Sequence, residues 1–357
     1  MADRLRKFAR SMRLRRTKIL GNQANFVLAG QSNIGEWVYA DGGAALESFR
    51  RTFLALKPKY RSVEFLSVAR GGAALLREFA AANAENYSDD GAMKPRIRQN
   101  YWCEEPDAGF GPAYDLADEK IRERRRQSIA FEAIIWSQGE SDAINLSEAA
   151  FDRYCAALER LLLMLRQKAG CERVLVQELG HWPSAGEAGE RGAERVRRAQ
   201  REVASAHPEI EIVSTSFDLP RRDGIHLTTK SYCTAAERMA VAIATGESSP
   251  LPASGSLGAD GRIEIGLDLA PGQRLNANER TAGWRLSDEA GEIAIAELVT
   301  SEDGRIVLIA ARPFETAVLT YAGARFVEDM SDGDFLTVIG ANLTLPVRPF
   351  SFTVGNI

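Results

Sequence analysis

The chain has 357 residues, of which 45% are hydrophobic and 26% are charged, an ordinary globular composition with length for roughly two domains. A formal net charge of −4 gives no general attraction to nucleic acid or anionic membranes, and no apolar run approaches the ~20 residues that span a bilayer. The four cysteines lie far apart without a Cys-x-x-Cys pair, so neither structural zinc nor a disulfide framework is indicated. We expect no metal and no cofactor.

Residues 1–23 are expected to form a basic N-terminal arm. Eight lysines and arginines face a single acid, Asp3, within residues 1–20, and Leu5, Phe8 and Met12 recur at helical spacing. A solvated arm, an anionic partner and a transit peptide all remain open interpretations. The start lacks the apolar segment of a secretory signal, so we expect a cytoplasmic protein, with secretion by another route left open.

Strand-like and helix-like patterns alternate across residues 24–246. Strands separated by helices predict a parallel sheet covered by helices on both faces, and such sheets bind ligands beyond the carboxyl ends of their strands. The stretch 80–112 has little periodicity and is expected to be a long functional loop. The expected strands are 26–29, 63–68, 133–136, 174–177 and 210–213, and the expected helices are about 112–127, 147–168, 189–206 and 229–244.

The texture of the sequence changes after the last of these helices. Residues 247–261 are rich in Gly, Ser and Pro, which is typical of a linker. Residues 262–357 contain alternating patterns such as "RIEIGLDL" and "RIVLIA", which predict a small β-rich accessory domain, as in a sandwich. This domain is a candidate for binding glycan, for covering an active cleft or for forming a homo-oligomer.

Three short motifs carry residues suited to nucleophilic catalysis: "GQSN" at 30–33, "WSQGESD" at 136–142 and "DGIHL" at 223–227. Each alone is also typical of a turn or a helix cap. A catalytic serine needs an imidazole to take its proton and a carboxylate to orient that imidazole. Of only three histidines, His226 follows an acid, Asp223, by three residues with a glycine between them, so a tight turn can bring both side chains together.

The same chemistry needs donors for the negative oxygen of a tetrahedral intermediate. Backbone N–H groups and a side-chain amide meet that need. Gly71 and Gly72, after the second expected strand, allow backbone to approach a substrate closely, and Gln138 after the third strand can supply the amide. The α/β-hydrolase elbow is disfavoured because Ile34 stands where that motif has glycine, and no His-x-x-x-His spacing supports a metal hydrolase.

Together, the motifs resemble the SGNH (GDSL-like) hydrolases, in the branch of sialate O-acetylesterases and carbohydrate esterases of family 6. The resemblance covers about residues 24–245, and it departs from the branch at Ala73, where threonine is common, and mildly at Ile34, where methionine is frequent. It implies a flavodoxin-like three-layer α/β sandwich. It also implies Ser32 as nucleophile, His226 as general base and then acid, Asp223 as its orienter, an oxyanion hole from the Ser32 amide, Gly71 or Gly72 and Gln138, and support from Asn33, Glu140 and Asp142.

The expected function is that of a serine esterase that removes short acyl groups, with acetyl on a sugar or glycan implied by the resemblance. Trp37, Trp102, His181 and Trp182 are candidates for binding the sugar at the active edge, with burial as loop anchors the alternative for the tryptophans. Two other functions stay open: a non-catalytic glycan-binding module, and a lipase or thioesterase on the same fold.

Overall fold

The computed structural model describes residues 22–87, 91–105, 108–181, 186–258, 261–276, 283–322 and 336–355. Its centre is a five-stranded parallel sheet in the order β2–β1–β5–β6–β7. Each strand overlaps an apolar run that the sequence predicts, because central strands buried on both faces are almost continuously hydrophobic. The strands are β1 (Gln23–Gly30), β2 (Ser62–Ser67), β5 (Ala133–Ser137), β6 (Arg173–Glu178) and β7 (Ile210–Thr215).

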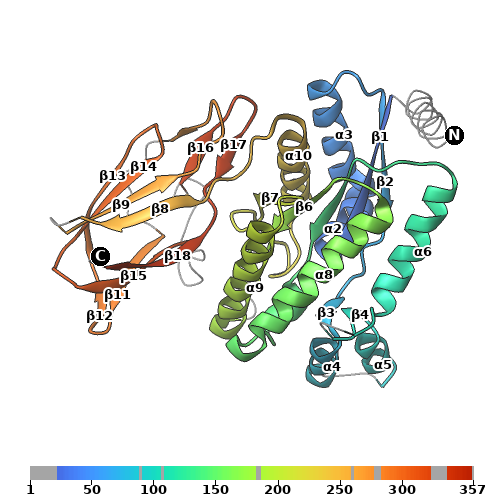
Figure 1. Ribbon diagram of the computed structural model, residues 1–357, viewed down its shortest axis with the longest axis horizontal. Coiled ribbons are helices and arrows are strands. Elements are labelled where there is room, and N and C mark those ends of the chain that lie inside the picture. The colour runs from blue at the N-terminus through green and yellow to red at the C-terminus, as the bar shows by residue number, and fades with distance from the viewer. Residues whose placement is uncertain are drawn as a thin grey trace, which may run out of the picture.

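Helices cover both faces of this sheet, which confirms the three-layer α/β fold (Figure 1). Alternate side chains of β1 serve the two layers, since successive residues of a strand point to opposite faces. Phe26 packs with the cluster that includes Phe49 and Tyr232, whereas Val27 packs with the cluster around Leu158. One layer holds α3 (Ala44–Leu56) and α10 (Thr229–Thr245), and the other holds α6 (Pro112–Arg126), α8 (Phe151–Ala169) and α9 (Gly186–Ala206).

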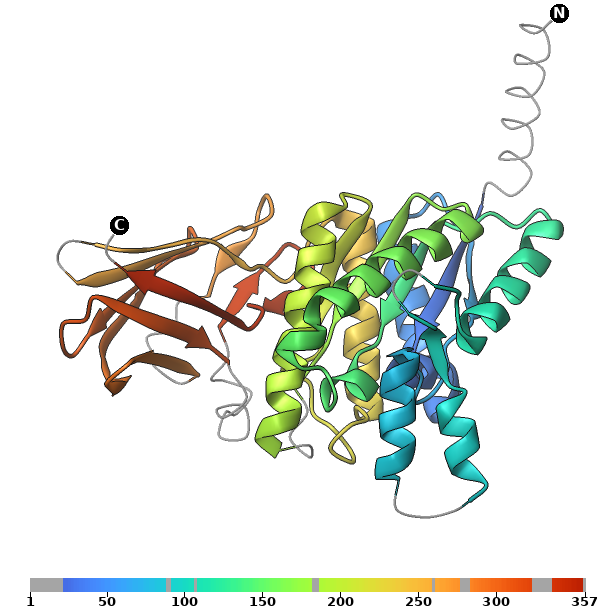
Figure 2. The same cartoon turned by 60° about the horizontal axis from the view of Figure 1, so that its bottom comes forward.

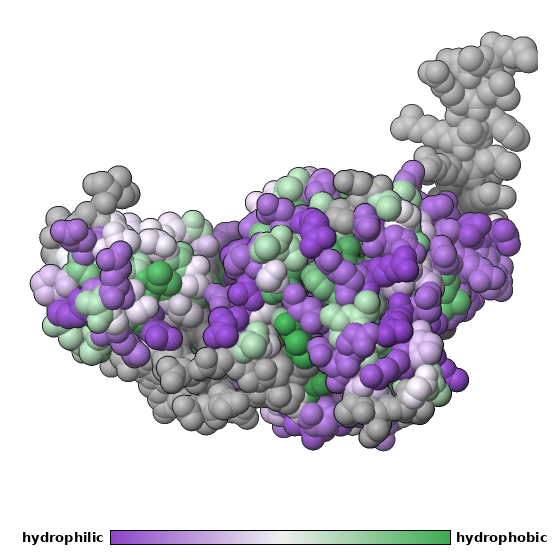
Figure 3. All heavy atoms as spheres, turned by 90° about the horizontal axis from the view of Figure 1, so that it is seen from below, coloured by the Kyte–Doolittle hydropathy of each residue, from purple (hydrophilic) through white to green (hydrophobic). Residues whose placement is uncertain are grey.

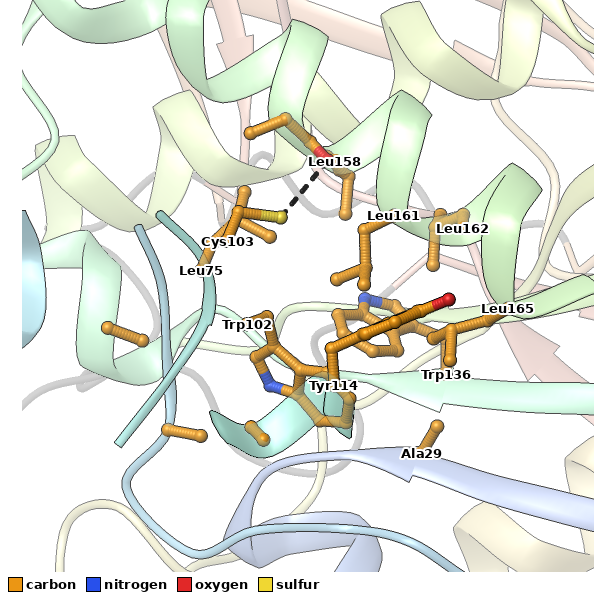
Figure 4. Close-up of a cluster of buried hydrophobic side chains, with 14 of the residues drawn as sticks. Ala29, Leu75, Trp102, Cys103, Tyr114, Trp136, Leu158, Leu161, Leu162 and Leu165 are labelled. Atoms are coloured by element: carbon orange, nitrogen blue, oxygen red, sulfur yellow. Dashed lines mark hydrogen bonds between the residues drawn. The ribbon is translucent and has the colours of Figure 1, made fainter. Parts of the chain in front are cut away.

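Within residues 80–112 the structure differs from the expected long loop. Two short helices, α4 (Arg77–Asn86) and α5 (Met93–Arg98), stand between β3 (Ala74–Leu76) and β4 (Tyr101–Cys103), which pair in parallel. Neither helix carries a long apolar stripe, and for that reason the sequence pattern did not reveal them. Figure 4 shows this small sheet joining the main core, where the β4 side chain Trp102 meets Trp136 edge to face with ring centroids 5.3 Å apart.

The C-terminal part is built from antiparallel sheets around a core of its own, as expected, and extends to one side of the α/β layers (Figure 2). The expected linker is not all connection: it contains β8 (Pro252–Leu257), which pairs with β9 (Arg262–Leu267). This Gly- and Ser-rich segment forms a strand because it pairs with β9, whose alternating side chains supply the apolar face. The other strands are β10 (Arg274–Leu275), β11 (Trp284–Asp288), β12 (Gly291–Ile293), β13 (Ile295–Thr300), β14 (Arg305–Ala310), β15 (Thr316–Tyr321), β16 (Thr337–Ile339), β17 (Thr344–Pro346) and β18 (Phe350–Gly355).

A buried ionic contact joins the C-terminal sheets to the α/β layers. Glu178, at the end of β6, is fully buried and lies 2.6 Å from Arg201 on α9 and 3.5 Å from Arg348 before β18. Burial alone would raise the pKa of the Glu178 carboxyl, but the charges of Arg201 and Arg348 outweigh it and lower the pKa. Phe217, which follows β7, also packs into the C-terminal core. The two parts therefore share an interface.

No helix in the described ranges is long and apolar enough to cross a bilayer.

Candidate active site

Ser32 stands at the point where the strand order changes direction. The chain leaves β1 for β2 on one side and later returns to β5 on the other, and open α/β sheets bind ligands beyond the strand ends at such a point. Gly30 ends β1 with φ 126°, and a Cβ there would lie 1.9 Å from the Ser137 carbonyl oxygen of β5. The close approach of the two strands thus requires glycine. It delivers half-buried Ser32 to the first turn of α2 (Ser32–Tyr39), whose backbone N–H groups lack helical partners.

Gln31 fastens this turn to the loop after β5. Its side-chain Nε2 donates to Ser141 Oγ at 2.9 Å, and its Oε1 accepts the Gly139 N–H at 3.0 Å. The backbone N–H of Gln31 also donates to the Ser137 carbonyl at 3.0 Å. The loop of the "WSQGESD" motif is therefore held against the loop of the "GQSN" motif by one side chain.

Asn33 fastens the same turn to the loop that carries Asp223 and His226. Its Nδ2 donates to Glu140 Oε1 at 2.5 Å and to the Ile225 carbonyl at 3.3 Å. Its Oδ1 accepts the Leu227 N–H at 3.4 Å and the Tyr232 hydroxyl at 2.8 Å. Because Ile225 and Leu227 flank His226, Asn33 brings that loop alongside the residue before it, Ser32. Asn33 and Glu140, both expected to have supporting roles, thus contact each other.

Asp223 and His226 form a pair within a single turn. The imidazole Nδ1 lies 2.9 Å from Asp223 Oδ2, and Asp223 Oδ1 accepts the backbone N–H of His226 at 2.7 Å and of Ile225 at 3.2 Å. Partial burial raises the pKa of Asp223. These hydrogen bonds and the nearby imidazole lower it by more, so the pKa of the Asp223 carboxyl lies well below its usual range. An ionised carboxylate on Nδ1 leaves Nε2 as the nitrogen able to exchange a proton with a neighbour.

The glycine pair after β2 lies against the serine. A Cβ on Gly71 would be 3.9 Å from Ser32 Cβ, and the Gly71 carbonyl is held by Asn100 Nδ2 at 2.7 Å. Gly71 and Gly72 are both exposed, and Gly72 has φ 70°. No hydrogen bond links the Ser32 hydroxyl to His226 in this structure, both residues being among those described. The loops that carry Ser32, Gly71 and His226 are adjacent, and the Ser32 hydroxyl and the His226 imidazole are not hydrogen-bonded.

Gln138 is placed differently from a free oxyanion donor. It is 1% exposed, and its Nε2 donates both to the Ala73 carbonyl at 3.3 Å and to Asp142. Both amide hydrogens are thus in use, so Gln138 would have to break one of these bonds to reach an oxyanion. Asp142 in turn accepts the Leu75 N–H at 2.8 Å, and its complete burial raises the pKa of its carboxyl to about 7.

The expected sugar-binding tryptophans are wrong where the structure describes them. Trp37 is 1% exposed and Trp102 is fully buried, each inside a hydrophobic cluster (Figure 4 for Trp102). Each ring packs against the sheet from its own element, so neither is available to stack on a sugar. His181 is also buried, and its Nδ1 pairs with the Glu190 carboxylate. Trp182, like residues 1–21 of the expected basic arm, lies outside the described residues.

The face seen from below in Figure 3 is largely hydrophilic over the α/β part, with a small hydrophobic area near its middle. In the described part of the chain, no three His, Cys, Asp or Glu side chains gather in a way that could hold a metal ion.

Comparison with known protein families shows which family the chain belongs to. Residues 40–245, more than half of the chain, match the family model of the carbohydrate esterases described as sialic acid-specific acetylesterases. The chain belongs to this esterase family. The match begins just after Ser32, so the serine turn of this esterase is supported by its own geometry and not by the family model. No curated protein sequence matches the esterase significantly.

A solved structure resembles this esterase in fold. A carbohydrate acetylesterase from Xanthomonas citri matches over 92% of this chain and 80% of its own, with 17% identity and a TM-score of 0.63. The coverage shows that the likeness extends into the C-terminal sheets. A protein from Arabidopsis thaliana matches over 62% of this chain and 98% of its own, with 17% identity and a TM-score of 0.43.

Proposed function

We propose that this carboxylic ester hydrolase removes acetyl groups from a carbohydrate through an acyl-enzyme on Ser32. The observation that carries the proposal is the Asp223–His226 pair, with Nδ1 at 2.9 Å from the carboxylate, held beside Ser32 by Asn33. His226 takes the Ser32 proton through Nε2 as the oxygen attacks the ester carbonyl, and returns it to the leaving alcohol. Water then attacks the acyl-enzyme with His226 again as the base.

The developing oxyanion is bound by backbone N–H groups. The Ser32 amide at the start of α2 and the amide of Gly71, which packs against Ser32, support this assignment. Such donors stabilise negative charge as it forms and typically contribute 10²–10³ in rate each. Gln138 joins them only if its bond to Ala73 or Asp142 is released. The acetyl and carbohydrate preferences rest on the family model, whose description names both.

The first test measures hydrolysis of 4-nitrophenyl acetate, butyrate and octanoate by the full chain. We expect acetate to be preferred, and Ser32→Ala to reduce the rate by roughly 10⁴-fold or more. Ser351→Ala, which removes an exposed hydroxyl on β18, is the matched control.

Undiminished turnover by Ser32→Ala would overturn the mechanism, and a preference for octanoate would indicate a lipase instead. The second test follows acetate release from acetylated sugars, including sialic acids and xylan fragments. Failure to release acetate from any sugar by an enzyme active on 4-nitrophenyl acetate would refute the carbohydrate assignment alone.

A further inference from the structure

Arg221 closes the base of the loop that carries Asp223 and His226. It forms an isolated antiparallel bridge with Leu227, and the next residue, Arg222, donates its backbone N–H to the His226 carbonyl at 2.8 Å. Residues 221–227 therefore make a small closed loop, and whatever fixes the Arg221 side chain fixes one end of it.

The guanidinium of Arg221 reaches away from this loop to the segment that follows β6. Its Nε donates to the His181 carbonyl at 2.7 Å, and its Nη1 is shielded from solvent. A Cβ at position 180 would lie 2.4 Å from Arg221 Nη2, so Gly180 leaves the space that the guanidinium occupies. The Arg221 side chain thus links the loop after β7 directly to the segment at the end of β6.

Two buried carboxylates provide the charge that this arginine needs. Glu140 is 8% exposed and belongs to the loop after β5, where Asn33 binds its Oε1; Glu190 is 3% exposed on α9 and pairs with His181. Burial lowers the pKa of Arg221, and the attraction of Glu140 and Glu190 opposes that effect. A cation enclosed in this way is stable only while the surrounding loops keep their places.

We propose that Arg221 is a positioning residue for catalysis: its guanidinium, which donates to the His181 carbonyl and fills the space left by Gly180, sets the distance between His226 and Ser32. The inference rests on the proposed function. A general base displaced by about 1 Å from its productive position can cost about 10²-fold in rate. Arg221 contacts neither the ester nor the reacting atoms, so its effect falls on the chemical step and not on substrate binding.

The test compares Arg221→Ala, Arg221→Gln and Arg221→Lys with the parent enzyme on 4-nitrophenyl acetate. We expect kcat to fall about 10²-fold in the first two with KM nearly unchanged. Arg221→Lys keeps the charge without the planar fork and should retain part of the lost activity. Millimolar guanidinium should restore activity to Arg221→Ala by filling the vacated site, and should leave the parent enzyme unaffected.

Arg173→Gln is the matched control, because Arg173 makes a two-pronged ion pair with Glu211 at 2.6 Å at the opposite end of β6. It should lower stability without lowering kcat. Activity of Arg221→Gln within twofold of the parent, a rise in KM alone, or loss of kcat with no recovery from either guanidinium or lysine would overturn the inference. Absence of Ser32-dependent turnover in the parent enzyme would instead refute the proposed function, so the two failures are distinguishable.

Discussion

Asp142 is a carboxyl group enclosed by protein, and its polar partners include the Leu75 N–H at 2.8 Å, the Gln138 amide and the Tyr154 hydroxyl. Burial raises the pKa of this carboxyl to about 7, against the opposing effect of its hydrogen bonds. The side chain joins the loop after β5 to the strand that follows Gly71 and Gly72. The buried position of Asp142 therefore orders the glycine loop, and the same burial disfavours the charged form of its carboxyl.

This burial predicts a pH-dependent stability. Between about pH 4, where an unfolded aspartate titrates, and pH 7 the folded chain binds more protons at Asp142 than the unfolded chain, so the contribution of Asp142 to the free energy of unfolding falls as pH rises. Urea unfolding of Asp142→Asn and the parent should give a difference, variant minus parent, that grows with pH and levels off above about pH 7. A difference that does not change with pH contradicts the prediction.

Asp303→Asn provides a control of opposite sign. A hydrogen bond from Ser301 lowers the pKa of the exposed Asp303, so that carboxylate stabilises the fold above its ordinary range and loses the effect as pH falls. The same difference measured for Asp303→Asn should fall as pH rises.

The sequence marks the chemistry of single residues better than their surroundings. Asp223 and His226 could be paired in advance because a three-residue spacing with glycine between them is a local fact. The hydrogen-bond partners of the Gln31 and Asn33 side chains lie between 107 and 199 positions away, so no local pattern reveals them. Trp37 and Trp102 were placed wrongly because an aromatic residue near a strand end reads equally as core or as sugar platform.

At the scale of elements, the ends of β1 and β5 decide where the serine stands. Gly30 holds a positive φ of 126° and touches the β5 backbone, whereas Gly42, after α2, holds φ 63° with no atom within 4 Å of a Cβ. Both glycines have a positive φ that other residues rarely adopt, Gly42 in the left-handed helical region and Gly30 outside it, and they differ in the space around them. This difference separates conformational strain from steric collision.

Gly30→Ala is expected to destabilise the fold by more than about 3 kcal/mol or to prevent folding, because a Cβ at 1.9 Å from the Ser137 oxygen forces β1 and β5 apart. Gly42→Ala should cost only about 1 kcal/mol, the strain of a positive φ. Thermal unfolding and soluble yield measure both variants. Equal losses in the two would contradict the collision.

The elements themselves were largely predictable, with specific exceptions. The five central strands and the helices α6, α8, α9 and α10 carry long apolar runs or stripes, which periodicity detects. The helix α3 was missing from the expected helices, although Leu46, Phe49 and Phe53 form a buried stripe on it. The short helices α4 and α5 lack such stripes, and β8 is held by its partner β9 and not by its own composition. Tertiary pairing decides those segments, and it is absent from local sequence.

At the scale of the whole molecule, the C-terminal sheets depend on one buried anion. Glu178 neutralises Arg201 from the α/β part and Arg348 from the β-rich part, and Arg201 also donates to the Pro349 carbonyl at 2.5 Å. Removing one member of such a cluster leaves buried charge without compensation, which is costlier than losing the attraction itself.

Glu178→Gln is therefore expected to lower the free energy of unfolding by about 3–5 kcal/mol and to separate one calorimetric transition into two, as the β-rich part loses its anchor. Glu264→Gln, which breaks an exposed pair with Arg305 at 2.6 Å within the C-terminal sheets, should cost less than about 1 kcal/mol. A single unshifted transition in Glu178→Gln would show that the interface does not need the ion pair.

The turn that holds Asp223 and His226 has a consequence for insertions and deletions. The Asp223 carboxylate is hydrogen-bonded to both the imidazole and the backbone N–H of His226, so the geometry of the pair depends only on residues 223–226. A residue added to the connection between Asp223's loop and β7 would shift both groups as one body and leave their bond intact. Insertions or deletions near this turn should therefore abolish activity by moving Asp223 and His226 together relative to Ser32. A second change of chain length that moves the pair back should restore activity.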